Sequence, residues 1–212
     1  MKVLAVGAQK GGVGKSTSSL YLAARAAELL GGTAERSVVG LLDRDEAKNL
    51  SELVALRPDL LLPGVALLEG EELPPARLGL QLVIVDTPPG FKATASLRES
   101  HMIVVPVLPE DQGIANLIKY LRNIEEQRLV VSPGMRLVAL LPTMVEPRRI
   151  LHQARMDDIR AIAADHHPTL SVLTPVQRRA RIGAYDLRAP DYDQPAKELF
   201  DHAGITSSVQ PV

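Results

Sequence analysis

Residues 9–17 read Gln9-Lys10-Gly11-Gly12-Val13-Gly14-Lys15-Ser16-Thr17. They lie between an apolar run that predicts a strand ending near residue 7 and a pattern that predicts a helix from about residue 14. This strand, glycine-rich loop and helix are typical of a P-loop. Its glycines allow backbone angles closed to other residues, so successive N–H groups can converge on phosphate oxygens at a positively polarised helix N-terminus. The sequence therefore predicts a site for ATP with Mg²⁺.

Individual residues of the loop have separate expected tasks. Lys15 should bridge the β- and γ-phosphates, the Ser16 hydroxyl should ligand Mg²⁺, and Thr17 should reach the α-phosphate. The alternative is a glycine-rich turn with a solvated lysine, but chance gives this pattern on the order of 10⁻⁴ or less in such a chain. The expected nucleotide contacts are Lys10, Gly11, Gly12, Val13, Gly14, Lys15, Ser16 and Thr17.

Short β-branched runs alternate with amphipathic stretches along the chain. Buried strands are predicted at residues 3–7, 37–42, 80–86, 103–108 and 137–141. Helices are predicted at residues 16–30, 46–56, 113–126 and 148–164. This alternation predicts an α/β fold with a single, doubly wound, mostly parallel sheet flanked by helices, and ligands at the carboxyl ends of the strands. We expect one P-loop ATPase domain over residues 1–205 and a flexible tail over residues 206–212.

The composition excludes several classes of protein. The 212 residues include no cysteine, which excludes disulfides, thiolate zinc sites and cysteine-ligated iron–sulfur clusters. Apolar stretches fall short of the roughly 20 residues that a membrane span needs. A net charge of −1 gives no global attraction to nucleic acid, so DNA contacts require a local patch. We expect a cytoplasmic protein without membrane attachment.

Two lysines flank the glycines, and their spacing narrows the class of P-loop protein further. Residues 10–16 resemble the deviant Walker A motif of the ParA/MinD family, in which a lysine is added at the position of Lys10. The resemblance implies an ATPase that forms a homodimer around ATP and Mg²⁺. It also implies that Lys10 reaches the partner's ATP as the counterpart of an arginine finger. An ordinary surface charge is the alternative for Lys10.

Two carboxylate-bearing stretches resemble the same family. Residues 38–45 form an apolar strand that ends in Asp43-Arg44-Asp45, and residues 83–90 resemble its Walker B and switch segment. A carboxylate at a buried strand end beside the P-loop can hold Mg²⁺ through water, which suits Asp86, with Asp43 as a further metal candidate. By resemblance Asp45 orients the attacking water, so the expected catalytic residues are Lys10, Lys15 and Asp45. The alternative for Asp43 and Asp45 is a helix cap.

The resemblance weakens along the chain, although it extends over about residues 1–200. Thr174-Pro175 falls where the partition branch of the family places its adenine-side loop, so Pro175 is expected near the nucleotide. One departure concerns hydrolysis: Glu46-Ala47 follows Asp45, where the family usually continues Pro-Gln. We therefore expect slow ATP turnover that depends on a partner.

The partition branch implies non-specific DNA binding by the ATP-bound dimer, association with the nucleoid, and a ParB-like centromere-binding protein that stimulates hydrolysis. This chain resembles the short form without an N-terminal helix-turn-helix domain. Clustered arginines can neutralise several phosphates if they share one face, and a solvated basic face is the alternative. The candidate DNA contacts are Arg148, Arg149, Arg155, Arg178, Arg179 and Arg181.

Two other functions stay open, and a metabolic enzyme is disfavoured. A MinD-like or other cargo-positioning ATPase would share the ATP chemistry, although residues 205–212 cannot form a basic amphipathic membrane anchor. The absence of cysteine excludes an enzyme of the nitrogenase reductase type. The sequence also contains no separate set of residues for a second substrate, which a synthetase such as dethiobiotin synthetase would need. An ATP-binding regulator that does not hydrolyse ATP would fit the Glu46-Ala47 departure.

Overall fold

The computed structural model describes residues 1–70, 72–75, 78–90, 94–130, 134–167 and 169–206. Its centre is a seven-stranded sheet in the order β3-β2-β4-β1-β5-β6-β7, and every described pairing is parallel. The strands are β1 (Lys2–Val6), β2 (Val39–Asp43), β3 (Val65–Leu68), β4 (Leu82–Asp86), β5 (Met102–Val107), β6 (Arg136–Pro142) and β7 (Ser171–Val172).

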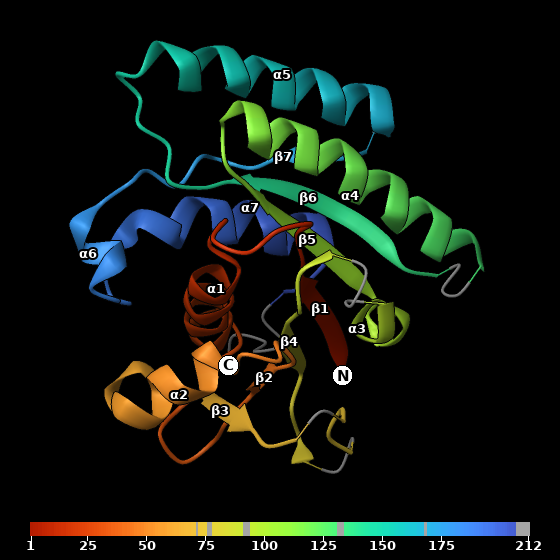
Figure 1. The fold of residues 1–212 in the computed structure, drawn as a ribbon. Helices are drawn as coiled ribbons and strands as arrows, with labels where there is room; N and C mark the ends of the chain where they lie inside the picture. Colours follow the sequence, from red (N-terminus) through yellow and green to blue (C-terminus); the bar gives the residue numbers. More distant parts are fainter. Residues whose placement is uncertain (71, 76–77, 91–93, 131–133, 168, 207–212) are drawn as a thin grey trace.

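Helices cover both faces of this sheet. They are α1 (Lys15–Leu29), α2 (Asn49–Leu56), α3 (Thr94–Glu99), α4 (Asp111–Val130), α5 (Ile150–His166), α6 (Ala180–Gly183) and α7 (Asp193–Ala203), with 3₁₀ turns η1 (Pro58–Leu60) and η4 (Pro190–Tyr192). Figure 1 shows α4 and α5 over one face and α1 with α7 over the other. The predicted doubly wound α/β fold is confirmed.

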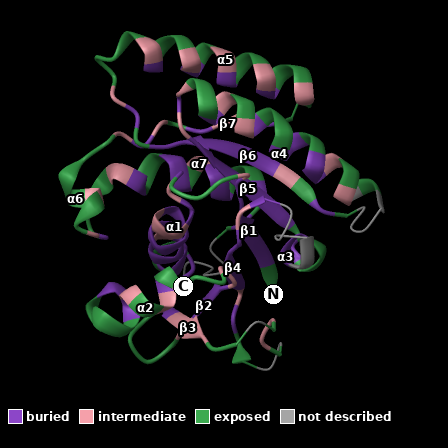
Figure 2. Ribbon diagram, viewed as in Figure 1, coloured by how far each residue is buried: buried purple, intermediate pink, exposed green. Residues whose placement is uncertain are grey.

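The core follows from strand pleating, because successive side chains point to opposite faces. In β1, Leu4 and Val6 pack with residues of α1 and α7, whereas Ala5 packs with residues of α4 and α5. β4 is buried along its whole length, as both-face coverage requires of a parallel strand. Figure 2 shows the buried residues running along the strands and the inner sides of the helices.

The five predicted strands all occur, but the sequence analysis missed the two edge strands β3 and β7. β7 contains only two residues, which is too short to show a period. The helix predicted from residue 46 begins later, at Asn49, because residues 45–48 form a turn closed by a bond from the Lys48 N–H to the Asp45 carbonyl (2.9 Å).

The expected domain boundary depends on the end of the chain. Ile205 is buried in the core that α7 shares with α1, so the packed part reaches at least this residue. Residues 207–212, most of the expected tail, lie outside the described residues. The division at residue 205 stays a prediction.

The strand order places the carboxyl ends of β1, β2 and β4 at the same edge of the sheet. β1 lies between β4 and β5, so the chain leaving β1 enters a crevice where the connections diverge. The register pairs Val6 with Asp86 and Asp43 with Asp86. The P-loop and both buried carboxylates therefore lie at the same edge of the sheet.

Candidate nucleotide-binding site

The loop between β1 and α1 has the backbone shape that its glycines predicted. Gly12 and Gly14 have φ values of 78° and 86°, in the left-handed region that favours glycine. A Cβ added at Gly11 or Gly12 would meet no atom of the described chain within 4 Å. The crest of the loop is therefore open, and its backbone N–H groups can approach a ligand closely.

Neighbouring loops hold this P-loop in place. The Gly90 N–H, after β4, donates to the Ala8 carbonyl (2.9 Å). The Thr143 hydroxyl, after β6, donates to the Val13 carbonyl (2.9 Å). The loop is thus fixed on two sides by segments that are distant in the sequence.

A tyrosine that the sequence analysis did not select lies beneath the start of the loop. A Cβ at Gly7 would lie 2.1 Å from the Tyr120 hydroxyl oxygen and 3.3 Å from the Thr87 hydroxyl oxygen. Tyr120 is completely buried, and burial raises the pKa of its hydroxyl. The close approach explains why glycine is required at position 7, which its place at a strand end did not reveal.

The two lysines of the loop have different surroundings. Lys15, the first residue of α1, is only 5% exposed, whereas Lys10 is exposed on the crest. A buried ammonium group at a helix N-terminus beside open N–H groups suits a polyanion such as a nucleoside triphosphate. Lys10 is accessible from outside the molecule.

Asp86, the last residue of β4, has the features of a cation ligand. It is fully buried; the Ser19 hydroxyl donates to its Oδ1 (3.3 Å), and its Oδ2 has no hydrogen-bond partner among the described residues. Burial raises the pKa of this carboxyl to about 7, against the opposing effects of the Ser16 hydroxyl and the Lys15 ammonium group. A divalent cation would supply the missing partner, so Asp86 and Ser16 could hold Mg²⁺.

Asp43 occupies the adjacent strand end but is engaged differently. Its Oδ1 accepts the Asp45 N–H (3.0 Å), and its Oδ2 accepts the Ser51 N–H in the first turn of α2 (2.9 Å). These bonds correspond to the helix-cap alternative. Asp43 therefore has less capacity left for a metal than Asp86.

Asp45 lies in the tight turn that precedes α2. Its Oδ1 accepts the Ala47 N–H (3.1 Å). Lys48, at the end of the turn, has a φ of 49° and donates from Nζ to the Asp43 carbonyl (2.7 Å). The structure thus places Asp45 directly after β2, at the same edge of the sheet as the P-loop, with one oxygen used by its own turn.

A cavity of about 190 Å³ adjoins the P-loop. It is lined by Gly14, Thr17, Thr143, Met144, Val176, Gln177, Arg178, Arg179, Ile182, Gly183 and Tyr192. Pro175 is outside this lining and borders a hollow between α5 and the segment after β7. The residues that follow Pro175, and not Pro175 itself, therefore line the cavity beside the P-loop.

Tyr192 in η4 is another residue of this cavity that the sequence analysis missed. Its ring stacks on Tyr21 with centroids 4.5 Å apart, and its hydroxyl lies 3.0 Å from the Ser18 hydroxyl. Both partners belong to α1, which carries the P-loop lysine. The acidic stretch after residue 190 gave no signal for this contact.

The six candidate DNA-binding arginines lie on neighbouring segments. An isolated bridge joins Val145 to Gln177, and the Arg178 N–H donates to the Val145 carbonyl (2.9 Å), so the two groups adjoin. Most of these arginines are ion-paired. The pairs are Arg149 with Glu110 (3.3 Å), Arg155 with Asp111 (2.7 Å), Arg178 with Glu146 (3.2 Å) and Arg181 with Asp191 (2.5 Å). Arg148 and Arg179 are exposed.

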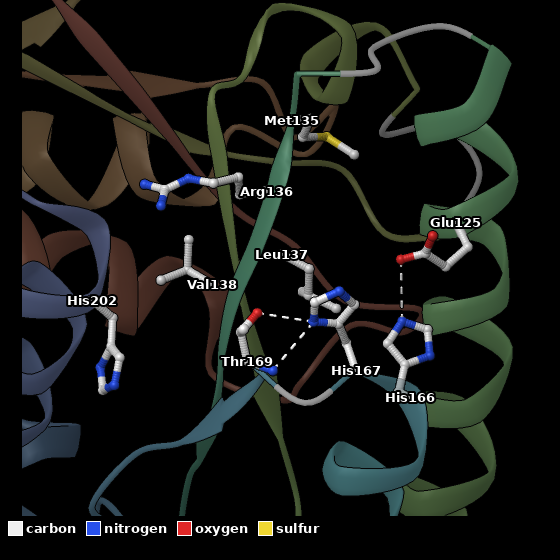
Figure 3. Close-up of a pocket in the computed structure, with 9 residues that line it drawn as sticks. All are labelled: Glu125, Met135, Arg136, Leu137, Val138, His166, His167, Thr169 and His202. Atoms are coloured by element: carbon white, nitrogen blue, oxygen red, sulfur yellow. Dashed lines mark hydrogen bonds and ion pairs between the residues drawn. The ribbon is translucent and has the colours of Figure 1, made fainter.

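A second hollow lies at the opposite end of β6 and does not extend the site. Figure 3 shows Glu125, His166, His167 and His202 around it. His166 pairs with Glu125 (3.3 Å), and Nδ1 of His167 accepts the Thr169 N–H (3.2 Å). Among the described residues, no group of three His, Asp or Glu side chains could hold a metal ion.

A parallel sheet, a loop of left-handed glycines that opens a helix, and a buried carboxylate on the neighbouring strand define a P-loop nucleotide-binding protein. A profile described as CobQ/CobB/MinD/ParA nucleotide binding domain matches residues 4–189, so the chain belongs to this family. The predicted ParA/MinD relationship is confirmed.

Individual relatives agree with this assignment. The chain is 30% identical to the chromosome-partitioning ATPase Soj of Thermus thermophilus, over 94% of this chain and 88% of that protein. An ATP complex of Cyanothece McdA has a TM-score of 0.73 at 16% identity, covering 99% of both chains. The Mycobacterium smegmatis cobyrinic acid a,c-diamide synthase with ADP and magnesium has a TM-score of 0.71 at 22% identity, covering 100% of both chains. These two structures share the fold.

One finding bears on membranes. No helix within the described ranges is both long and apolar enough to cross a bilayer. The structure therefore offers no spanning helix in these ranges.

Proposed function

We propose that this chain is a ParA-like ATPase that serves plasmid or chromosome partition. ATP with Mg²⁺ binds at the P-loop and holds two copies of the chain together. The dimer binds DNA without sequence preference and associates with the nucleoid. Hydrolysis to ADP, stimulated by a ParB-like centromere-binding partner, releases the protein from DNA. The similarity to Soj over almost the whole chain supports the partition branch.

The contrast between Lys10 and Lys15 carries this proposal. Lys15 is buried at the start of α1, where it would serve the nucleotide of its own chain. Lys10 lies exposed on the crest of the same loop. ATP can drive dimerisation only through contacts that the monomer lacks, and an exposed lysine beside the phosphates can supply such a contact to a second copy.

The chain's own residues divide the chemical work. The N–H groups of the P-loop and Lys15 orient the phosphates, and Ser16 with Asp86 would hold Mg²⁺. When bound, Mg²⁺ would neutralise phosphate charge. Asp45 would orient the attacking water through Oδ2, since its Oδ1 accepts the Ala47 N–H. This partial engagement of Asp45 fits slow, partner-dependent turnover.

DNA contacts would come from the adjoining arginine groups. Arg148 and Arg179 are exposed, and the neighbouring arginines could exchange their carboxylate partners for phosphates. Because such an exchange costs the existing ion pairs, we expect modest affinity that falls steeply with salt. Dimerisation would double the number of arginines presented to one duplex.

The first experiment measures steady-state ATP hydrolysis with and without non-specific duplex DNA, at low and moderate salt. Stimulation by DNA that salt abolishes would support the partition function. Turnover that is indifferent to DNA would instead favour a MinD-like or other cargo-positioning ATPase.

Two lysine variants separate binding from dimerisation. Lys15→Ala should abolish ATP binding, and wild-type affinity in that variant would remove the basis for the site. Lys10→Ala should retain ATP but lose ATP-dependent dimerisation or turnover. An unchanged dimer mass with ATP, together with unchanged turnover, would exclude the cross-subunit role of Lys10.

An ATP-binding regulator without hydrolysis is the second candidate. The observation in its favour is the turn at Asp45, whose Oδ1 is bonded to the Ala47 N–H where relatives usually have Pro-Gln. Dimerisation with ATP but no turnover, even with DNA and partner present, would select this candidate.

A further inference from the structure

Arg44 joins two segments that flank the candidate site. It lies between Asp43 and Asp45, directly after β2. Its N–H donates to the Asp86 carbonyl (2.9 Å), which continues the pairing of β2 with β4 by one residue. Although its side chain is charged, it is only 8% exposed. A guanidinium held in this way must have specific partners.

One partner of the Arg44 side chain is on the helix that comes after β4. Nη2 of Arg44 lies 2.5 Å from Oε2 of Glu99, the last residue of α3. Such charge-assisted bonds are short and directional, and they restrain both side chains. One ion pair therefore connects the turn that carries Asp45 to the helix after the segment that begins with Asp86.

Two hydrogen bonds to Asp45 close the turn after Arg44. The Lys48 N–H donates to the Asp45 carbonyl (2.9 Å), and the Ala47 N–H donates to Asp45 Oδ1 (3.1 Å). A shift of Arg44 would therefore carry the carboxylate of Asp45 with it. The P-loop has separate anchors at Gly90 and Thr143, which do not pass through Arg44.

We propose that Arg44 and Glu99 form a positioning pair that sets Asp45 relative to the phosphates, so that ATP turnover depends on the pair while ATP affinity does not. This inference rests on the proposed ATPase function. Misplacement of a catalytic group by about 1 Å costs up to roughly a hundredfold in rate. The half-exposed Glu99 can remain hydrated when Arg44 is replaced, so the variant need not unfold.

The test compares kcat and KM for ATP in Arg44→Gln and Glu99→Gln. We expect kcat to fall about tenfold with KM within about twofold of wild type. Arg44→Lys should recover part of the loss, and the exchanged pair Arg44→Glu with Glu99→Arg should recover more than either single change. Arg57→Gln is the matched control, since Arg57 forms an exposed pair with Asp59 (2.8 Å) away from the site.

Several results would overturn the inference. These are an unchanged kcat in both single variants, a loss of ATP affinity equal to the loss of kcat, or an equal effect in Arg57→Gln. A wild-type protein that binds or hydrolyses no ATP would refute the proposed function instead. In that case amide hydrogen exchange at Ala47 and Lys48 still tests the pair: Arg44→Gln should accelerate exchange, and unchanged exchange would refute the positioning role.

Discussion

Two aspartates end adjacent strands at the same level of the sheet, yet their carboxylates are used differently. Asp43 of β2 and Asp86 of β4 are register partners, and both are at most 2% exposed. Both oxygens of Asp43 accept backbone N–H groups, whereas one oxygen of Asp86 has no hydrogen-bond partner among the described residues. Position and burial alone therefore do not identify a ligand-binding carboxylate.

The difference arises from the path of the chain after each strand. After β2 the chain turns within a few residues into α2, whose first N–H groups have no partner within the helix, and one of them, the Ser51 N–H, donates to Asp43. After β4 the chain returns to the P-loop, so Asp86 meets side chains of α1 instead. Leaving a buried acceptor unsatisfied costs about 1–3 kcal/mol, which a bound cation would recover.

The largest expected effect is on ATP turnover, which distinguishes Asp86 from Asp43. Asp86→Asn should lower kcat for ATP by about 10³-fold, because the amide cannot replace a charged metal ligand. The free energy of unfolding without nucleotide should stay equal or rise, since a buried unpaired charge is lost. Steady-state kinetics and urea unfolding measure both quantities. Wild-type turnover in this variant would show that Asp86 holds no metal.

The second expected effect concerns pH. The pKa of Asp86 is raised from 3.8 to about 7 in the folded protein, so between these pH values the folded state keeps a proton that the unfolded state releases. The contribution of Asp86 to the free energy of unfolding should therefore fall as pH rises through this window, by up to roughly 4 kcal/mol.

Urea unfolding of wild type and Asp86→Asn between pH 4 and pH 8, with EDTA and without nucleotide, isolates this contribution. The variant should gain stability relative to wild type with rising pH and level off above about pH 7. Asp43→Asn is the control that keeps Asp86. Parallel curves for wild type and Asp86→Asn would contradict the raised pKa.

The third effect is on folding stability through Asp43. Asp43→Ala removes the acceptor for the N–H groups of Asp45 and Ser51, so it should lower the free energy of unfolding by about 2 kcal/mol. Asp43→Asn should lose less, because its amide oxygen still accepts one bond. A stable Asp43→Ala protein that hydrolyses no ATP would place Asp43 among the ligands after all.

The smallest effect tests the hydrogen bond from Ser19 to Asp86. Ser19→Ala removes the hydroxyl that donates to Oδ1 (3.3 Å), and we expect a loss of about 1 kcal/mol in the free energy of unfolding. Turnover should fall less than in Asp86→Asn. Thermal and urea unfolding measure the change, and a loss as large as that of Asp43→Ala would mean that the two carboxylates are held alike.

The sequence predicted the central strands because burial on both faces produces continuous apolar runs. It missed β3 and β7, because an edge strand is short and its pairing is set by a partner distant in the sequence. It also placed the start of α2 at residue 46, since the helical spacing continues through a turn that Asp43 and Asp45 close with side-chain bonds. Such side-chain bonds depend on the folded arrangement of the chain, which the helical spacing in the sequence does not show.

The loop at the centre of the site followed from its glycines and lysines alone. Tyr120 and Tyr192 did not, because aromatic residues at helical spacing ordinarily indicate a core. Their proximity to Gly7 and Ser18 arises only when α4 and η4 pack beside the loop. The pairing of Arg44 with Glu99 joins segments more than 50 residues apart, which a single sequence does not reveal.

The two hydrogen bonds that anchor the P-loop affect the kinetics of nucleotide capture. Because Ala8 and Val13 are already bonded to Gly90 and Thr143, the loop loses little backbone entropy when a ligand arrives. Stopped-flow capture of a fluorescent nucleotide by the monomer should be a single second-order phase without a slow rearrangement. Any slower phase whose rate rises with protein concentration would then report the meeting of two loaded copies.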